Sequence, residues 1–117
     1  MSEIAKRLNQ CRKPTGEIGK VIAKDMNIAH FELTNWGFEK INIKKNDVIL
    51  DIGCGGGRTV NRMASMAAQG KTFGIDYSTD CVKWSKDYNE KLIKEGSVEI
   101  LHASVEKIPF ENDKFDI

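Results

Sequence analysis

"VILDIGCGGGRTV", residues 48–60, is the stretch of this sequence that decides the fold. It contains a short apolar run, Val48–Ile52, interrupted only by Asp51, and then four glycines within five positions. A run of this length and composition is typical of a strand buried on both faces. Because glycine loses more backbone entropy on folding than any other residue, four glycines weaken a packed element. The stretch therefore predicts a buried strand, a glycine turn that a ligand can approach, and a helix.

Hydrophobic spacing along the rest of the chain predicts an alternation of helices and strands. Such alternation favours a parallel sheet with helices on its faces, and right-handed crossovers give the strand order 3-2-1. The expected fold class is therefore α/β, a partial Rossmann-like, doubly wound parallel sheet. Helices are expected over 15–37, 58–69 and 79–96, strands over 48–52, 71–75 and 98–103, and the opening of a fourth strand over 115–117.

Each expected helix carries apolar residues at helical spacing, which mark the face that packs on the core. Gly37 is expected to end the N-terminal helical segment, because glycine often follows a helix. This divides the chain into a helical arm over 1–37 and a sheet-containing part over 38–117. The expected buried faces are Ile18, Ile22, Met26, Ala29, Leu33 and Trp36 in the arm, Val60, Met63, Ala64 and Ala67 after the glycines, and Cys81, Trp84, Ser85, Tyr88 and Leu92 in the last helix.

Composition excludes several classes of protein. The net charge is only +1, so no general basic field for nucleic acid is indicated. No apolar run approaches the length of a membrane span, and the polar N-terminus lacks the core of a signal peptide. The three cysteines are widely spaced, which indicates neither a disulfide framework nor a zinc site. We expect a cytoplasmic protein with no metal, no nucleic acid and no membrane among its partners.

The glycine turn is a candidate ligand site. A helix N-terminus offers free N–H groups and partial positive charge, and ligands of open α/β sheets bind at the carboxyl ends of strands. Asp76 ends the next strand, 19 positions after Gly57, where a carboxylate can bind a ribose diol. The alternative for Asp76 is a turn or helix-capping aspartate before Ser78.

The spacing of the glycines narrows the type of ligand. Gly53, Gly55 and Gly57 alternate, and the third glycine of a nicotinamide fingerprint falls on Arg58. The lysine of a phosphate-binding P-loop is also missing. A nucleoside without a pyrophosphate fits better, and Asp51 beside the loop would attract an ammonium or sulfonium. The alternative for Asp51 is a buried carboxylate that binds loop N–H groups.

Three segments together resemble the motifs of class I S-adenosylmethionine-dependent methyltransferases. "VILDIGCGGG" is similar to the first motif, "FGIDYS" to the second, and "HASVEKIPFENDKFDI" to the segment that follows the third strand. The resemblance covers residues 48–117, and residues 12–37 are similar to the helical segment of some small members. It implies S-adenosyl-L-methionine as cofactor and a methyltransferase with a small-molecule acceptor.

The resemblance also implies roles by position. Asp51 and the glycines would surround the methionine part of the cofactor, Asp76 would bind the ribose, and Tyr77 would lie against the adenine. Ser104 stands where the family commonly has an aspartate, so the N–H of Val105 is expected to contribute to the adenine contact. The cofactor-binding residues implied in this way are Asp51, Gly53, Cys54, Gly55, Asp76, Tyr77, Ser104 and Val105.

Other candidate site residues have both a functional and a structural interpretation. Gly16, Gly19 and Lys20 would close over the cofactor carboxylate or are ordinary helix-start residues. His30 is expected to be a packed or surface histidine rather than a base, and the Cys54 thiol a packing group. No catalytic residue is identified, and the sequence does not name the methyl acceptor.

The chain ends where the fourth strand opens. Family members continue with four more strands, so we expect a fragment of a longer protein or self-association through the open edge of strand one. The sequence also allows two other functions. A non-catalytic S-adenosylmethionine-binding or interaction module is the alternative, and a nicotinamide-dependent oxidoreductase is opposed by Arg58.

Overall fold

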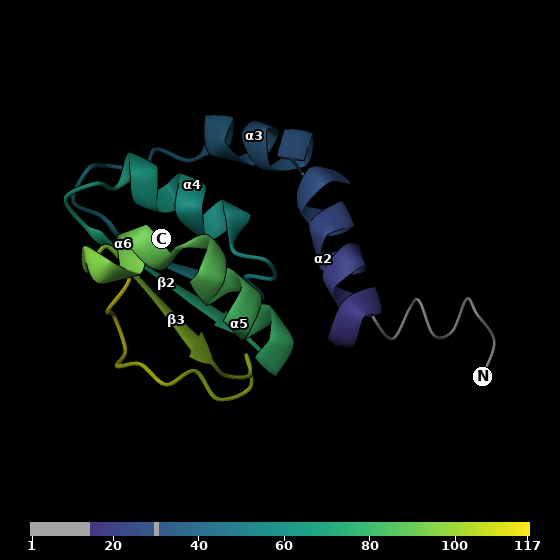
Figure 1. Cartoon of the computed structure of the whole chain (residues 1–117). Coiled ribbons are helices and arrows are strands. Elements are labelled where there is room, and N and C mark those ends of the chain that lie inside the picture. Colours follow the sequence, from purple (N-terminus) through teal and green to yellow (C-terminus); the bar gives the residue numbers. More distant parts are fainter. Residues whose placement is uncertain (1–14, 30) are drawn as a thin grey trace.

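The computed structural model describes residues 15–29 and 31–117. Its centre is a parallel sheet of three strands, which are β1 (Val48–Ile52), β2 (Lys71–Asp76) and β3 (Val98–His102). The strand order is β1-β2-β3, which confirms the predicted order 3-2-1 and the α/β class. Figure 1 labels β2 and β3 beside the helices that pack on them. The carboxyl ends of all three strands therefore lie at one edge of the sheet.

The helices alternate with the strands, as the hydrophobic spacing predicted. Two of the predicted helix bounds differ clearly from the observed ones. Gly37 does not end the N-terminal segment, because the helix continues through the expected boundary at residue 37 to Lys40. The last predicted helix is split at Asn89, whose backbone leaves the helical region at φ −104° and ψ 19°. The helices are α2 (Gly16–Ala29), α3 (Phe31–Lys40), α4 (Arg58–Met66), α5 (Thr79–Tyr88) and α6 (Glu90–Lys94).

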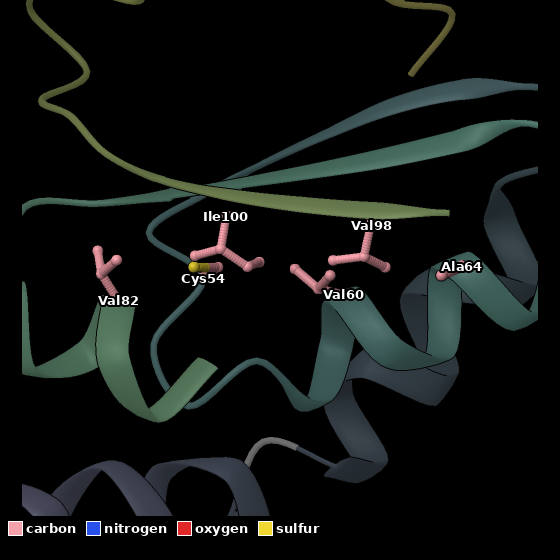
Figure 2. Packing of buried hydrophobic residues seen from close by; sticks show 6 residues of the cluster. All are labelled: Cys54, Val60, Ala64, Val82, Val98 and Ile100. Carbon is pink, nitrogen blue, oxygen red and sulfur yellow. The ribbon is translucent and has the colours of Figure 1, made fainter. Parts of the chain in front are cut away.

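One face of the sheet packs against α4 and α5. Figure 2 shows six side chains that meet in the space between β3 and these two helices. Gly74 on β2 permits this close approach, because a Cβ there would lie 2.9 Å from both Ile100 and Val60. The predicted buried face of α4 is confirmed. The six residues of the cluster are Cys54, Val60, Ala64, Val82, Val98 and Ile100.

The opposite face is covered by the segment that follows β3. Phe73 alternates with Gly74 along β2, so its side chain lies on the other side of the sheet. Its ring packs edge-on against Phe110 and Phe115, with centroids 5.0 and 5.6 Å away. These aromatic contacts fold residues 103–117 back over the sheet.

The last residues begin to pair with β1. The N–H of Asp116 donates to the Val48 carbonyl at 2.8 Å, and the N–H of Leu50 donates to the Ile117 carbonyl at 3.0 Å. These bonds match the expected opening of a fourth strand. They cover part of the edge of β1 that was expected to be open, whereas Ile52 at the carboxyl end of β1 is 48% exposed.

The N-terminal helices pack differently from the prediction. Gly19 and Ala23 are the buried residues of the part of α2 whose side chains are described, whereas Ile18 is 67% exposed. Leu33 and Trp36 on α3 are exposed as well. Helix α2 lies against α5. The predicted burial of this arm is therefore wrong for Ile18, Leu33 and Trp36.

Helix α3 contacts α4 through cation–π interactions. Phe31 on α3 packs beneath the guanidinium groups of Arg58 and Arg62, 4.5 and 4.6 Å from its ring centroid. On α5 the predicted face is also partly wrong, because Tyr88 is exposed and Val82 takes a place in the core.

Candidate functional site

The loop between β1 and α4 has an unusual backbone. Gly53, Gly55 and Gly57 have φ angles of +74°, +55° and +85°. Residues with a Cβ rarely adopt this left-handed region, so the alternating glycines are required by the turn itself. The N–H groups of Gly53 and Cys54 both donate to the Ile75 carbonyl, at 2.9 and 3.0 Å. The loop is thereby tied to the end of β2.

The two sides of this loop differ. A Cβ added at Gly53 or at Gly55 would meet no atom within 4 Å, so open space lies beside these two residues. A Cβ added at Gly57 would lie 2.5 Å from Ser85 Oγ and 2.6 Å from Asn89 Nδ2. The first two glycines leave room that a ligand can use, whereas Gly57 is needed for packing against α5.

Asp51 and Asp76 lie on the same face of the sheet. Asp51 pairs with Gly74 in the parallel register, and Asp76 follows Gly74 by two residues. Asp76 Oδ2 accepts from the N–H of Gly55 at 2.9 Å, and Oδ1 accepts from the N–H of Ser78 at 2.8 Å. These bonds support the interpretation of Asp76 as an aspartate that stabilises the turn before Ser78. Each carboxylate oxygen can accept a second bond, so a ribose contact stays a compatible prediction.

The two carboxyl groups produce a negative potential beside the loop. Burial, and secondarily the charge of Asp76, raise the pKa of Asp51 from 3.8 to about 6. A carboxyl group whose pKa is raised in this way gains from a nearby cation. An acidic pair at the carboxyl end of the sheet, next to open space at Gly53 and Gly55, fits a nucleoside with a cationic tail.

The side chain of Cys54 faces the core rather than the open side of the loop (Figure 2). Burial is the main cause that raises the pKa of its thiol to about 12, so the thiolate nucleophile is disfavoured. Its N–H donates to Ile75 and its carbonyl accepts from Gly57. The thiol is the packing group that was expected, and any contact of Cys54 with a cofactor would involve the main chain.

Tyr77, Ser104 and Val105 follow the carboxyl ends of β2 and β3. The side chains of Tyr77 and Val105 are 53% and 60% exposed. His102 Nε2 lies 2.8 Å from the Tyr77 carbonyl, which links the two strand ends. Ser104 Oγ accepts from the N–H of Glu106 at 3.2 Å. An aromatic and an aliphatic side chain at this edge suit a flat base, and their contact with adenine stays a prediction.

The N-terminal candidates Gly16, Gly19 and Lys20 lie at the beginning of α2. The N–H of Gly16 donates to Asp80 Oδ2 at 2.7 Å, and Gly19 is buried. These contacts support the helix-start reading, although they bring the beginning of α2 to the beginning of α5. Lys20 is exposed, and His30 lies outside the described residues.

Two residues that hold the loop were not recognised as functional. Ser85 Oγ donates to the Gly55 carbonyl at 3.1 Å, and Asn89 Nδ2 donates to the Gly57 carbonyl at 3.0 Å. Ser85 was predicted only as part of an apolar helix face, and Asn89 was not singled out. Two small polar residues four positions apart, on a face expected to be buried, were the signal that could have identified them.

Within residues 15–29 and 31–117, no helix has both the length and the apolar character needed to cross a membrane. The same part of the chain brings together no group of three His, Cys, Asp or Glu side chains that could hold a metal ion.

Comparison with known proteins identifies the domain. A family model described as "Methyltransferase domain" matches residues 43–117, which include the glycine loop and all three strands. A solved structure of a SAM-dependent methyltransferase from Aquifex aeolicus is 25% identical and superposes with a TM-score of 0.67. The match covers 83% of this chain and 53% of that one.

Two curated relatives have named activities. The 2-phytyl-1,4-naphtoquinone methyltransferase of Nostoc punctiforme is 28% identical over 74 residues, covering 62% of this chain. Sphingolipid C9-methyltransferase 1 of Gibberella zeae is 35% identical over 79 residues, covering 67% of this chain. The matched segments are 32% and 15% of those proteins, so the chain spans about a third of their length or less.

Proposed function

Because this chain belongs to the methyltransferase domain family, we propose that it is the cofactor-binding half of an S-adenosylmethionine-dependent methyltransferase. The observation that carries the proposal is the loop after β1. Two of its left-handed glycines, Gly53 and Gly55, border open space, and two carboxylates lie on the same sheet face beside it. This combination suits a cationic nucleoside better than a pyrophosphate.

The residues present fit the parts of this cofactor. Gly53 and Gly55 leave room for the methionine part, and Asp51 provides a negative charge for its ammonium and sulfonium. Asp76 would accept hydrogen bonds from the ribose hydroxyls while it keeps its bonds to Gly55 and Ser78. Tyr77 and Val105 would flank the adenine, with Ser104 beside them.

The cofactor, when bound, supplies an electrophilic methyl group on a sulfonium. The task of this chain is to bind and orient it, since correct alignment of the reactants provides much of the rate of a displacement. Asp51 would also replace the water that otherwise solvates the positive charge. The described residues supply these binding groups, and groups for the acceptor belong to the remainder of such a fold.

For the acceptor we propose a small molecule, including lipids and quinones. The support is the names of two relatives, one acting on a phytyl naphthoquinone and one on a sphingolipid. A cytoplasmic location and self-association at the unpaired end of β1 remain part of the proposal. The association is tested by light scattering after size exclusion, where a monomer at every concentration would contradict it.

A ligand panel tests the proposed cofactor. Thermal unfolding of the 117-residue chain is followed with S-adenosylhomocysteine, NAD or ATP, each at several concentrations. S-adenosylhomocysteine at 100 times its dissociation constant should add about 2.7 kcal/mol of stability. NAD and ATP should add none. Stabilisation by NAD without stabilisation by S-adenosylhomocysteine would overturn the proposal in favour of an oxidoreductase.

A further inference from the structure

Two polar side chains hold the glycine loop from the side of α5. Ser85 lies in the last part of α5 and Asn89 directly follows that helix, and we call the pair the α5 clamp. Ser85 Oγ donates to the Gly55 carbonyl at 3.1 Å, and Asn89 Nδ2 donates to the Gly57 carbonyl at 3.0 Å. The clamp therefore binds two carbonyl groups of a loop that is far away in sequence.

The burial of the clamp indicates that these bonds matter. Ser85 is 0% exposed and Asn89 is 1% exposed. Burying a polar group is unfavourable unless it is hydrogen-bonded, and an apolar residue of similar size avoids the problem. Among the described residues, Asn89 Oδ1 has no hydrogen-bond partner. This asparagine thus retains a buried, unpaired oxygen while its amide donates to the Gly57 and Ser85 carbonyls.

The loop needs external support because of its composition. Its glycines have no side chains with which to fix their own conformation, and glycine has the widest choice of backbone dihedrals. The side toward β2 is fixed by bonds to Ile75 and Asp76. The clamp supplies the bonds on the other side, and Gly57 fits against it because any Cβ would collide with both clamp residues.

We infer that Ser85 and Asn89 are positioning residues, which hold Gly53–Gly57 in the shape that admits S-adenosylmethionine although neither needs to touch it. The inference rests on the proposed function. A ligand finds only the fraction of molecules whose loop is already formed, so its apparent affinity falls in proportion when that fraction falls. The clamp thereby acts on affinity through the shape of the loop.

The test uses the 117-residue chain and the variants Ser85→Ala, Asn89→Ala and the double variant. Val98→Ala is the matched control, because Val98 is buried in the same core cluster but lies on β3. Amide hydrogen exchange without ligand is measured over residues 53–57 and, for comparison, over the three strands. The dissociation constant for S-adenosylhomocysteine is measured by calorimetry on the same samples.

We expect the double variant to lose about tenfold in exchange protection over residues 53–57 relative to the strands, since both hydrogen bonds to the loop carbonyls are removed. Its dissociation constant should rise by a similar factor. Val98→Ala should lower protection throughout without a selective change in the loop, and should leave the dissociation constant nearly unchanged. A uniform loss in the double variant would give the clamp a merely structural role and overturn the inference.

Two further results would separate a failure of the positioning role from a failure of the proposed function. A loosened loop with unchanged affinity also overturns the inference, because the clamp then does not act on the ligand. If the unmodified chain does not bind S-adenosylhomocysteine at all, the proposed function fails for this chain, and with it the positioning role. Hydrogen exchange then still decides whether the clamp holds the loop.

Discussion

Gly57→Ala is expected to lower the free energy of unfolding by about 2–5 kcal/mol. The left-handed backbone at φ +85° is unfavourable for alanine by about 1–2 kcal/mol. The new methyl group would also lie 2.5 Å from Ser85 Oγ, 2.6 Å from Asn89 Nδ2 and 2.9 Å from Ser85 Cα. The last of these is a main-chain atom that no rotamer change can move, and overpacking adds about 1–3 kcal/mol.

Gly53→Ala is the matched control within the same loop. Its φ is +74°, but a Cβ there would meet nothing within 4 Å. Only the cost of the left-handed backbone applies, so Gly53→Ala should lower the free energy of unfolding by about 1–2 kcal/mol. Urea unfolding followed by far-ultraviolet circular dichroism measures both variants. Equal losses for the two would refute the reasoning, because packing of Gly57 against α5 would then contribute nothing.

Three further predictions concern single side chains. Asp76→Ala should weaken S-adenosylhomocysteine binding by about 1.5–3 kcal/mol in calorimetry, whereas the exposed Asp87→Ala on α5 should not; unchanged affinity would remove Asp76 from the site. The pKa of Asp51 is raised from 3.8 to about 6, so the folded state binds the proton more tightly than the unfolded one and stability should fall as the pH rises between these values. The Asp51→Asn variant should therefore be more stable than the unmodified chain at pH 7.5, by up to about 3 kcal/mol, and should lose this advantage below about pH 4. A gain in stability that does not depend on pH would contradict the raised pKa of Asp51. Cys54 should resist alkylation by iodoacetamide at pH 8 and react after unfolding, because burial raises its pKa to about 12; rapid labelling in the folded chain, located by mass spectrometry, would show that the thiol is accessible.

Local patterns predicted the central elements well. The run Val48–Ile52 became β1 without change, and Val60, Met63 and Ala64 on α4 are all buried. Ser78 precedes α5 and caps it, since its hydroxyl accepts from the N–H of Cys81 at 3.2 Å. Such features depend on residues that are neighbours in sequence, so their physics is already present in a short window.

Predictions that required knowledge of a packing partner were less successful. Ile18 and Trp36 belong to regular apolar stripes but lie largely exposed, whereas the small residues Gly19 and Ala23 of α2 are buried. Tyr88 also belongs to an expected buried face but is exposed, whereas Val82 on the same helix is buried. Helical spacing identifies a face that can pack, but only the neighbouring element decides which residues on that face are covered.

By itself, the sequence determined the α/β order, the glycine turn and the two acids beside it, because strand length, helical period and glycine spacing are local properties. Only the tertiary structure shows that the glycines differ in their surroundings. Open space lies beside Gly53 and Gly55, whereas Gly57 fits tightly against Ser85 and Asn89. The tertiary structure also revealed Ser85 and Asn89 as the support of that loop, across 30 and 32 positions of chain. Contacts over such separations arise when the crossovers close, and no short window of sequence contains them.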